Sequence, residues 1–316
     1  MNNSSVSTIK QRFESALQIT QERFHLFTAH QFNLIESANE YPQSLIEAMR
    51  YGLLLGGKRI RPHLLYTIGE LFGVNASSLN YMALALESIH AYSLIHDDLP
   101  AMDDDALRRG NPTCHVKFGE ANAILAGDAL QTFAFEILSR PLEDVDASKQ
   151  LKILHYLAKS SGLMGMCGGQ VLDLESENKS ITFTDLKNIH RLKTGALIKA
   201  AAMIPVIASR FDSPLVLSVI EKYAEAIGLA FQIQDDILDV IGDTKTLGKF
   251  AGADEALGKN TYPSLIGLDE AKKMAHELIE EANKQISFLA QEKLFHSEEK
   301  LMFLKDLNHF IITRMY

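Results

Sequence analysis

The sequence predicts an all-α protein whose 316 residues form a single domain (1–316) with about ten or more helices. Apolar residues recur at helical spacing, for example at Phe13, Leu17 and Phe24. There is no series of alternating strands bounded by turn residues, and no phosphate-binding glycine fingerprint follows a strand. No linker rich in serine, glycine or proline divides the chain, which favours one domain.

Four long helices are predicted from runs rich in alanine, leucine and isoleucine. They cover residues 79–95, 121–138, 211–239 and 269–289. Pro62 suits the first turn of another helix, whereas 109–112 and 242–260 are expected to be loops. The first and third long helices are apolar over more than one face, which is typical of helices in the middle of a bundle.

The composition excludes several classes of protein. The net charge is −9, with 40 acidic against 31 basic residues, so non-specific nucleic-acid binding is not expected. The two cysteines, Cys114 and Cys167, fit neither a metal-ligand spacing nor a disulfide framework, which favours the cytoplasm. Residues 1–10 lack the pattern of a secretory signal, and the apolar stretch 195–209 is too short to span a bilayer. We therefore expect a soluble protein without stable membrane insertion.

Two aspartate clusters continue the apolar runs of the first and third long helices. They contain Asp97, Asp98 and Asp103, and Asp235, Asp236 and Asp239. A single acidic run usually marks a solvated face. Here the preceding apolar run places the carboxylates near buried surface, where they repel one another unless a cation or proton neutralises them.

The spacing of the aspartates favours a cation. Asp235 and Asp239 are four residues apart and point the same way on a helix. Asp97 and Asp103 are six apart, so we expect Pro100 to distort or end the helix and to bring Asp103 back. Ligation by carboxylate oxygens alone suits Mg²⁺, which also accepts phosphate oxygens.

Basic residues flank both clusters. They are Lys58, Arg61, Arg108, Arg109, Lys193, Lys249 and Lys259. Each one taken singly would more often be a solvated surface residue. Guanidinium groups match phosphate oxygens in pairs and lysines act as point charges, so together they suggest two anion pockets.

At this point the residues resemble a known family, the short-chain trans-prenyltransferases (polyprenyl diphosphate synthases), and most closely the bacterial-type farnesyl diphosphate synthases. The matching segments, in the family's order, are GGKRIRP (56–62), ESIHAYSLIHDDLPAMDDDALRRG (87–110), GGQVLDL (168–174), KTGALI (193–198), FQIQDDILDVIGD (231–243) and LGKFAGADEALGKNTYPSLIG (247–267). A single aspartate motif would be weak evidence, whereas this ordered set is specific. The resemblance implies an isoprenoid-synthase bundle around a central cavity.

The resemblance also implies roles for individual residues. Metal binding falls to Asp97, Asp98, Asp103, Asp235, Asp236 and Asp239, with about three Mg²⁺ ions, or Mn²⁺, per active site. Isopentenyl diphosphate would be bound by Lys58, Arg61, His90 and Arg109. The allylic diphosphate would be bound by Arg108, Lys193, Thr194, Gln232, Lys249 and Lys259. Lys193, Thr194 and Gln232 would be catalytic, with the oxygens of Thr194 and Gln232 steadying a carbocation. Gln170 and Asp173 would line the same cavity, and Phe250 departs from the basic residue that relatives often carry.

The implied reaction is the 1'-4 condensation of isopentenyl diphosphate with dimethylallyl and geranyl diphosphate, with release of diphosphate. The growing chain would run beside the helix that ends at Asp97. Tyr92, five residues upstream and about 7 Å away along the helix, would close this tunnel at farnesyl length together with Ser93. The family also implies a homodimer.

Three alternatives remain open from the sequence. A related synthase could stop at geranyl or continue to geranylgeranyl diphosphate. A class I terpene cyclase would want a second motif of Asn-Asp, Ser/Thr and Glu, whereas this chain has Asp235, Asp239 and Asp243. A non-catalytic helical subunit would commonly lose aspartates from one cluster, and both clusters are intact here.

Overall fold

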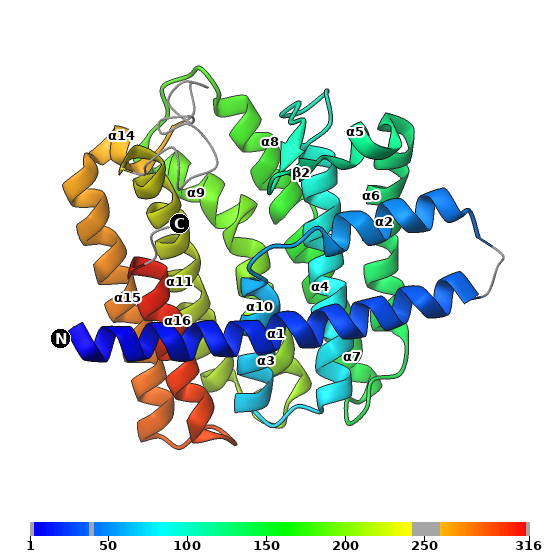
Figure 1. Cartoon of the computed structure of the whole chain (residues 1–316). Coiled ribbons are helices and arrows are strands. Elements are labelled where there is room, and N and C mark those ends of the chain that lie inside the picture. The colour runs from blue at the N-terminus through cyan, green and yellow to red at the C-terminus, as the bar shows by residue number, and fades with distance from the viewer. Residues whose placement is uncertain (1–2, 38–40, 242–259, 314–316) are drawn as a thin grey trace.

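The computed structural model describes residues 3–37, 41–241 and 260–313, and these ranges are mostly helical, which confirms the all-α class (Figure 1). The helices are α1 (Asn3–Ser37), α2 (Gln43–Leu54), α3 (Ile60–Leu71), α4 (Ala76–Asp97), α5 (Cys114–Phe118), α6 (Glu120–Ser139), α7 (Ala147–Ser161), α8 (Met166–Ser176), α9 (Phe183–Lys193), α10 (Gly195–Ala208), α11 (Pro214–Ile241), α14 (Tyr262–Ile266), α15 (Leu268–Gln291) and α16 (Glu298–Thr313).

The four predicted long helices are confirmed as α4, α6, α11 and α15. The third begins at Pro214 instead of residue 211, because proline is favoured in the first turn of a helix, where its missing N–H is not needed. Pro62 lies in the first turn of α3, as expected. The predicted loop at 242–260 falls, except for Asn260, outside the described residues.

The loop predicted at 109–112 is instead part of a short antiparallel ribbon. β1 (Leu107–Arg108) pairs with β2 (Asn111–Pro112). Arg109 and Gly110 form the turn between them, with φ angles of 54° and 75°. Two successive residues with positive φ match the twist of a tight hairpin, and glycine adopts this conformation without steric cost.

α4 and α10 form the centre of the bundle. α4 packs against α2, α3, α6 and α10, and residues 200–208 of α10 are all buried. Lys199, near the start of α10, is ion-paired at 2.9 Å with both Glu221 and Glu225 of α11. The sequence predicted that α11 would be as central as α4. The charged side chains of Glu221 and Glu225 instead keep one face of α11 exposed.

The N- and C-terminal helices close one side of the molecule. α1 crosses in front of the other helices in Figure 1, and it packs against α16. Arg12 donates two hydrogen bonds of 2.5 Å to the buried Asp306, and the Phe13 ring stacks on Phe310 with centroids 4.4 Å apart. Among the described helices, none is long and apolar enough to cross a membrane. The whole arrangement holds the loop between α2 and α3 against α1.

Candidate active site

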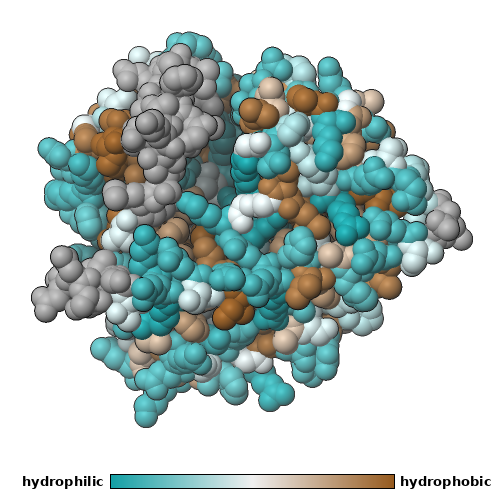
Figure 2. Space-filling view, viewed as in Figure 1, coloured by the Kyte–Doolittle hydropathy of each residue, from teal (hydrophilic) through white to brown (hydrophobic). Residues whose placement is uncertain are grey.

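A cavity of about 340 Å³ lies where α4, α8 and the junction of α9 and α10 meet. Several predicted site residues line it, namely Arg61, His90, Tyr92, Ser93, Asp97, Gln170, Lys193 and Thr194. Its remaining walls are Leu94, His96, Met102, Met166 and Cys167. Figure 2 shows the surface hollowed near the top of the view, between the two sides of the bundle. The fold thus gathers around one cavity residues that are more than 130 positions apart, since Arg61 and Thr194 both line it.

The first aspartate cluster lies where α4 ends at Asp97. The backbone N–H of Asp103 donates to the carbonyl oxygen of Asp97 at 2.8 Å, so the chain does turn back after the helix, as predicted from Pro100. The half-buried Asp97 lines the cavity. Burial raises its pKa to about 6; the charge of Lys193 opposes this rise and the charge of Asp103 adds to it. A carboxylate in this setting gains from a nearby cation.

Asp98 is turned away from the cavity and pairs with an arginine. Its buried carboxylate accepts hydrogen bonds from Arg108 Nε at 2.8 and 2.9 Å and from Nη2 at 2.5 Å. This two-pronged pairing fixes the guanidinium plane. In this structure Asp98 therefore positions Arg108, whereas metal binding by Asp98 and diphosphate binding by Arg108 stay predictions.

The second cluster lies within the last turns of the continuous helix α11. Asp235 and Asp239 are half-buried and Asp236 is buried. Asp236 Oδ1 accepts from Gln232 Nε2 and Oδ2 accepts from the backbone N–H of Tyr262, both at 2.9 Å. Thr194 Oγ1 donates in turn to Gln232 Oε1 at 3.0 Å. The predicted catalytic pair Thr194 and Gln232 is thus hydrogen-bonded and anchored on Asp236.

Arginines gather around His90. Arg61 Nη1 lies 3.2 Å from His90 Nε2, and because a guanidinium only donates, His90 accepts with a neutral ring. The pKa of His90 lies well below its ordinary value, first because the ring is buried and then because Arg61, Arg109, Arg59 and Arg108 are positively charged. These residues form the dense positive charge that a diphosphate group requires.

The sequence did not lead us to the acidic residue that pairs with this arginine cluster, Glu87. Arg59 and Glu87 form a buried ion pair of 2.7 Å, and Arg59 also donates to the carbonyl oxygen of Leu53 at 2.6 Å. The signal was available, because Glu87 is the one acidic residue within the buried, apolar α4 before its aspartates. This carboxylate offsets part of the charge of the arginines.

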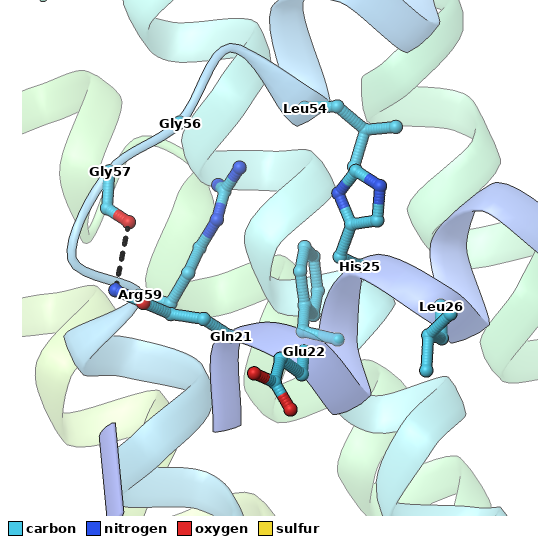
Figure 3. Close-up of a pocket in the computed structure, with 9 residues that line it drawn as sticks. Gln21, Glu22, His25, Leu26, Leu54, Gly56, Gly57 and Arg59 are labelled. Carbon is cyan, nitrogen blue, oxygen red and sulfur yellow. Dashed lines mark hydrogen bonds between the residues drawn. The ribbon is translucent and has the colours of Figure 1, made fainter. Parts of the chain in front are cut away.

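The glycine loop between α2 and α3 completes the basic region. Arg109 Nη1 donates to the carbonyl oxygen of Gly56 at 2.5 Å, and a Cβ at Gly57 would lie 2.5 Å from the same guanidinium. Only glycine therefore lets Arg109 approach here. Figure 3 shows the outer side of this loop, where the Gln21 amide of α1 donates to the carbonyl oxygen of Gly57 at 3.4 Å. The exposed Lys58 reaches back toward α16, with Nζ 5.9 Å from the centre of the Phe310 ring.

Lys193, at the end of α9, pairs with Asp173 of α8 at 2.6 Å. The predicted residues Lys249, Phe250 and Lys259 lie outside the described residues. Within the described ranges, no three histidine, cysteine or acidic side chains converge closely enough to hold a metal ion by themselves. An ion held here would need water or phosphate oxygens to complete its shell, which is how Mg²⁺ is commonly bound.

The predicted gate residues lie side by side on α4. Tyr92 is only 5% exposed and its hydroxyl lies 3.2 Å from Cys167 Sγ, while Ser93 Oγ donates to the carbonyl oxygen of His90 at 2.9 Å. The opposite wall, Met166 and Cys167 on α8, was not singled out from the sequence. These two residues immediately precede the GGQVLDL segment, and their position next to this motif could have identified them.

The comparisons with known proteins agree with this geometry. The sequence profile of the polyprenyl synthetase family matches residues 42–293. The chain belongs to this family of isoprenoid-diphosphate-joining enzymes. It is 55% identical over 271 residues to the farnesyl diphosphate synthase of Escherichia coli K12, a match that covers 85% of this chain and 89% of that protein.

Two solved structures show the same fold. A geranylgeranyl pyrophosphate synthetase from Pyrococcus horikoshii superposes with a TM-score of 0.83 at 32% identity, covering 96% of this chain and 100% of that one. A geranyltransferase from Helicobacter pylori, complexed with magnesium and isoprenyl diphosphate, gives 0.76 at 31% identity and covers 95% and 96% of the two chains. Relatives named for different products thus share one architecture, so local features of the cavity must set product length.

Proposed function

We propose that the protein is a farnesyl diphosphate synthase, a prenyltransferase of isoprenoid biosynthesis. It joins isopentenyl diphosphate head-to-tail to dimethylallyl and then to geranyl diphosphate. The observation that carries this proposal is the single cavity that Asp97, Lys193 and Thr194 share with Arg61 and His90. Asp97 of the first carboxylate cluster and the cationic side chains of Arg61 and Lys193 thereby line the same space, which suits anionic substrates bound with a metal ion.

The residues present fit magnesium. Asp97 carries a raised pKa because it is buried among other carboxylates, and a divalent cation would relieve that repulsion. We assign the ions to Asp97 and Asp103 on one side and to Asp235 and Asp239 on the other. Asp98 and Asp236 support these ligands without binding metal in this assignment. Their carboxylates already accept hydrogen bonds from protein donors. When bound, the metal ions neutralise charge on the leaving diphosphate.

The protein's own side chains bind, orient and exclude water. Isopentenyl diphosphate is held by Arg61 and Arg109, together with the neutral His90. The solvent-exposed Lys58 lies at the rim of this pocket. Lys193 holds the allylic diphosphate, and Arg108 is aimed by Asp98 toward the same group. Positive charge there stabilises the diphosphate as the allylic C–O bond breaks.

Thr194 lines the cavity and donates its hydroxyl proton to Gln232, which leaves the lone pairs of its oxygen available to stabilise positive charge. The carbocation is attacked by the alkene, and a proton is then lost. The acidic side chains of the site are assigned to metal or accept hydrogen bonds from cationic and neutral donors, so we assign the departed diphosphate as the proton acceptor. The apolar walls, including Leu94 and Met166, keep water from the cation.

We also propose that the chain works as a cytoplasmic homodimer of single-domain subunits. Ile124 and Leu125 on α6 and Val171 on α8 are 43%, 54% and 53% exposed, and a partner subunit would bury them. Light scattering coupled to gel filtration would give twice the 35.1 kDa chain mass, and Leu125→Glu would reduce it toward the monomer. A wild-type monomer at micromolar concentration would contradict the assignment.

The activity test uses the purified full chain with isopentenyl diphosphate, an allylic starter and Mg²⁺. Products are dephosphorylated and sized by gas chromatography with mass spectrometry, beside an EDTA control. Farnesol as the main product, lost with EDTA, is the expected result. No prenyl product with dimethylallyl or geranyl diphosphate would overturn the proposal and favour the non-catalytic subunit.

A further inference from the structure

Cys167 stands opposite the residue that we assign as the end of the tunnel. It is the second residue of α8 and its side chain is exposed to the cavity, whereas Cys114, the other cysteine, is buried. Its sulfur lies 3.2 Å from the hydroxyl oxygen of Tyr92, a hydrogen-bonding distance for sulfur. Side chains of α4 and α8 therefore meet across the cavity at this contact.

The other edge of the Tyr92 ring is also held. His96, one turn further along α4, meets it edge-on with ring centroids 5.8 Å apart at 74°. His96 is in turn fixed by α6: its Nε2 lies 3.0 Å from the carbonyl oxygen of Ile124. A Cβ at Gly127 would come within 2.1 Å of the same nitrogen, so α6 leaves no space behind the imidazole.

We propose that Cys167 is a specificity-determining residue, which fixes the Tyr92 ring across the tunnel and so limits the length of the product. This inference rests on the proposed synthase activity. The large ring of Tyr92 rotates about its Cα–Cβ bond, and it closes the tunnel only while the side chain stays in one χ1 rotamer. The imidazole stops rotation of the ring toward α6. The hydroxyl end is held by the thiol of Cys167 from α8 and by the side chain of Gln131 from α6.

Removing the hydrogen bond should let the ring leave this rotamer while the metal and diphosphate sites stay intact. Cys167→Ala removes the sulfur, and Tyr92→Phe removes only the hydroxyl. Cys167→Ala should raise the ratio of geranylgeraniol to farnesol about fivefold, the ratio that corresponds to one ordinary hydrogen bond. Tyr92→Phe also loses the contact with Gln131 and should raise the ratio at least as much. Cys167→Ser keeps a donor and acceptor at this position, so its products should be those of the wild type.

The double variant Cys167→Ala with Tyr92→Phe distinguishes a shared hydrogen bond from two separate effects. It should give the same product ratio as Tyr92→Phe alone, because without the hydroxyl the sulfur of Cys167 has no hydrogen bond to Tyr92 left to lose. The control is Leu163→Ala, a larger truncation at an 83% exposed residue shortly before α8. This control should leave the ratio unchanged.

Thiol chemistry gives an independent measurement on the unmodified protein. A small methanethiosulfonate reagent should modify Cys167 and leave the buried Cys114 unmodified, as read by peptide mapping. Geranyl diphosphate with Mg²⁺ should slow the modification of Cys167, because the prenyl chain would cover the thiol. Equal rates with and without geranyl diphosphate would place Cys167 outside the tunnel and overturn the proposal.

The synthase activity and the role of Cys167 can be refuted separately. If the wild-type protein makes no prenyl product, the proposed activity is wrong. If the wild type makes farnesol and Cys167→Ala makes the same product ratio as Cys167→Ser and Leu163→Ala, the activity stands and the role of Cys167 is refuted.

Discussion

The two aspartate clusters lie at the ends of α4 and α11 and present their carboxylates by different means. In the first, the helix stops at Asp97 and the chain folds back, so that Asp103 returns to the helix end through its backbone N–H. In the second, α11 runs without a break to Ile241, and helical spacing alone aligns Asp235 with Asp239.

Each cluster also has a buried middle aspartate, Asp98 in the first and Asp236 in the second, and the two are held by different partners. Asp98 is neutralised by the full charge of Arg108, whereas Asp236 accepts from an amide and a backbone N–H. Asp98 therefore depends on a partner ten residues away on the short strand β1, and Asp236 on α11 itself and on α14. The comparison teaches that the ion pair with Arg108 fixes the carboxylate where the helix ends, whereas the donors described for Asp236 within and beside a continuous helix are neutral.

The largest expected effect tests whether both clusters are required equally. Asp97→Asn and Asp235→Asn should each lower kcat by about a thousandfold, the scale of losing one strong electrostatic contact in a transition state. Steady-state assays with geranyl diphosphate give the rates, and far-UV circular dichroism checks the fold. An Asp235→Asn enzyme with wild-type kcat would remove the second cluster from the metal site.

A stability measurement should separate the two middle aspartates. Asp98→Asn leaves the Arg108 charge without its partner and should cost about 3 kcal/mol of unfolding free energy. Asp236→Asn loses one neutral contact and should cost about 2 kcal/mol. Urea titrations at pH 7 compare them, with the exposed Asp104→Asn as the control expected to change little. Equal costs for both would contradict the distinction between charged and neutral support.

Low pH should destabilise the part of the fold that carries the second aspartate cluster. His190 of α9 is 8% exposed and packs on Tyr262, whose backbone N–H supports Asp236. Burial lowers the His190 pKa from 6.5 to about 4; the charge of Asp173 opposes this and that of Lys193 adds to it. The unfolded chain thus binds the proton more readily, so stability is present above pH 6.5 and is lost as pH falls toward 4.

At pH 5 the loss from His190 should be about 2 kcal/mol. Urea midpoints at pH 7 and pH 5 would measure it, and His190→Gln, which cannot titrate, should show a smaller drop between the two pH values. His63 of α3, whose pKa burial also lowers to about 4, remains in both proteins and so cancels in the comparison. A variant whose drop equals that of the wild type would show that His190 is not the titrating group.

The smallest effect concerns the hydrogen bond that joins Thr194 to the second cluster. Thr194→Val keeps the shape and removes the hydroxyl, so kcat should fall about fivefold, the ratio that one neutral hydrogen bond provides. Thr194→Ser, which keeps the hydroxyl, should retain the wild-type rate. A loss in Thr194→Ser as large as that in Thr194→Val would assign the effect to packing of the methyl group.

Much of the site could be predicted because its chemistry is local in the sequence. The return of Asp103 followed from Pro100, and the alignment of Asp235 with Asp239 followed from helical spacing. The hairpin at Arg109 was missed, because the positive φ of a non-glycine residue depends on contacts that the local sequence does not specify. The pairing of Asp98 with Arg108 was missed for a related reason, since both residue types equally suit a metal and a phosphate.

The sequence by itself determined the all-α class, the four long helices and the family, because apolar periodicity and ordered motifs are properties of neighbouring residues. Only the tertiary structure decided which side chains face the cavity. α10, not α11, became the most buried helix, since ion pairs draw Glu221 and Glu225 to the surface around Lys199. The contact of Cys167 with Tyr92 joins residues 75 positions apart, and it exists only because the fold places α8 across the cavity from α4.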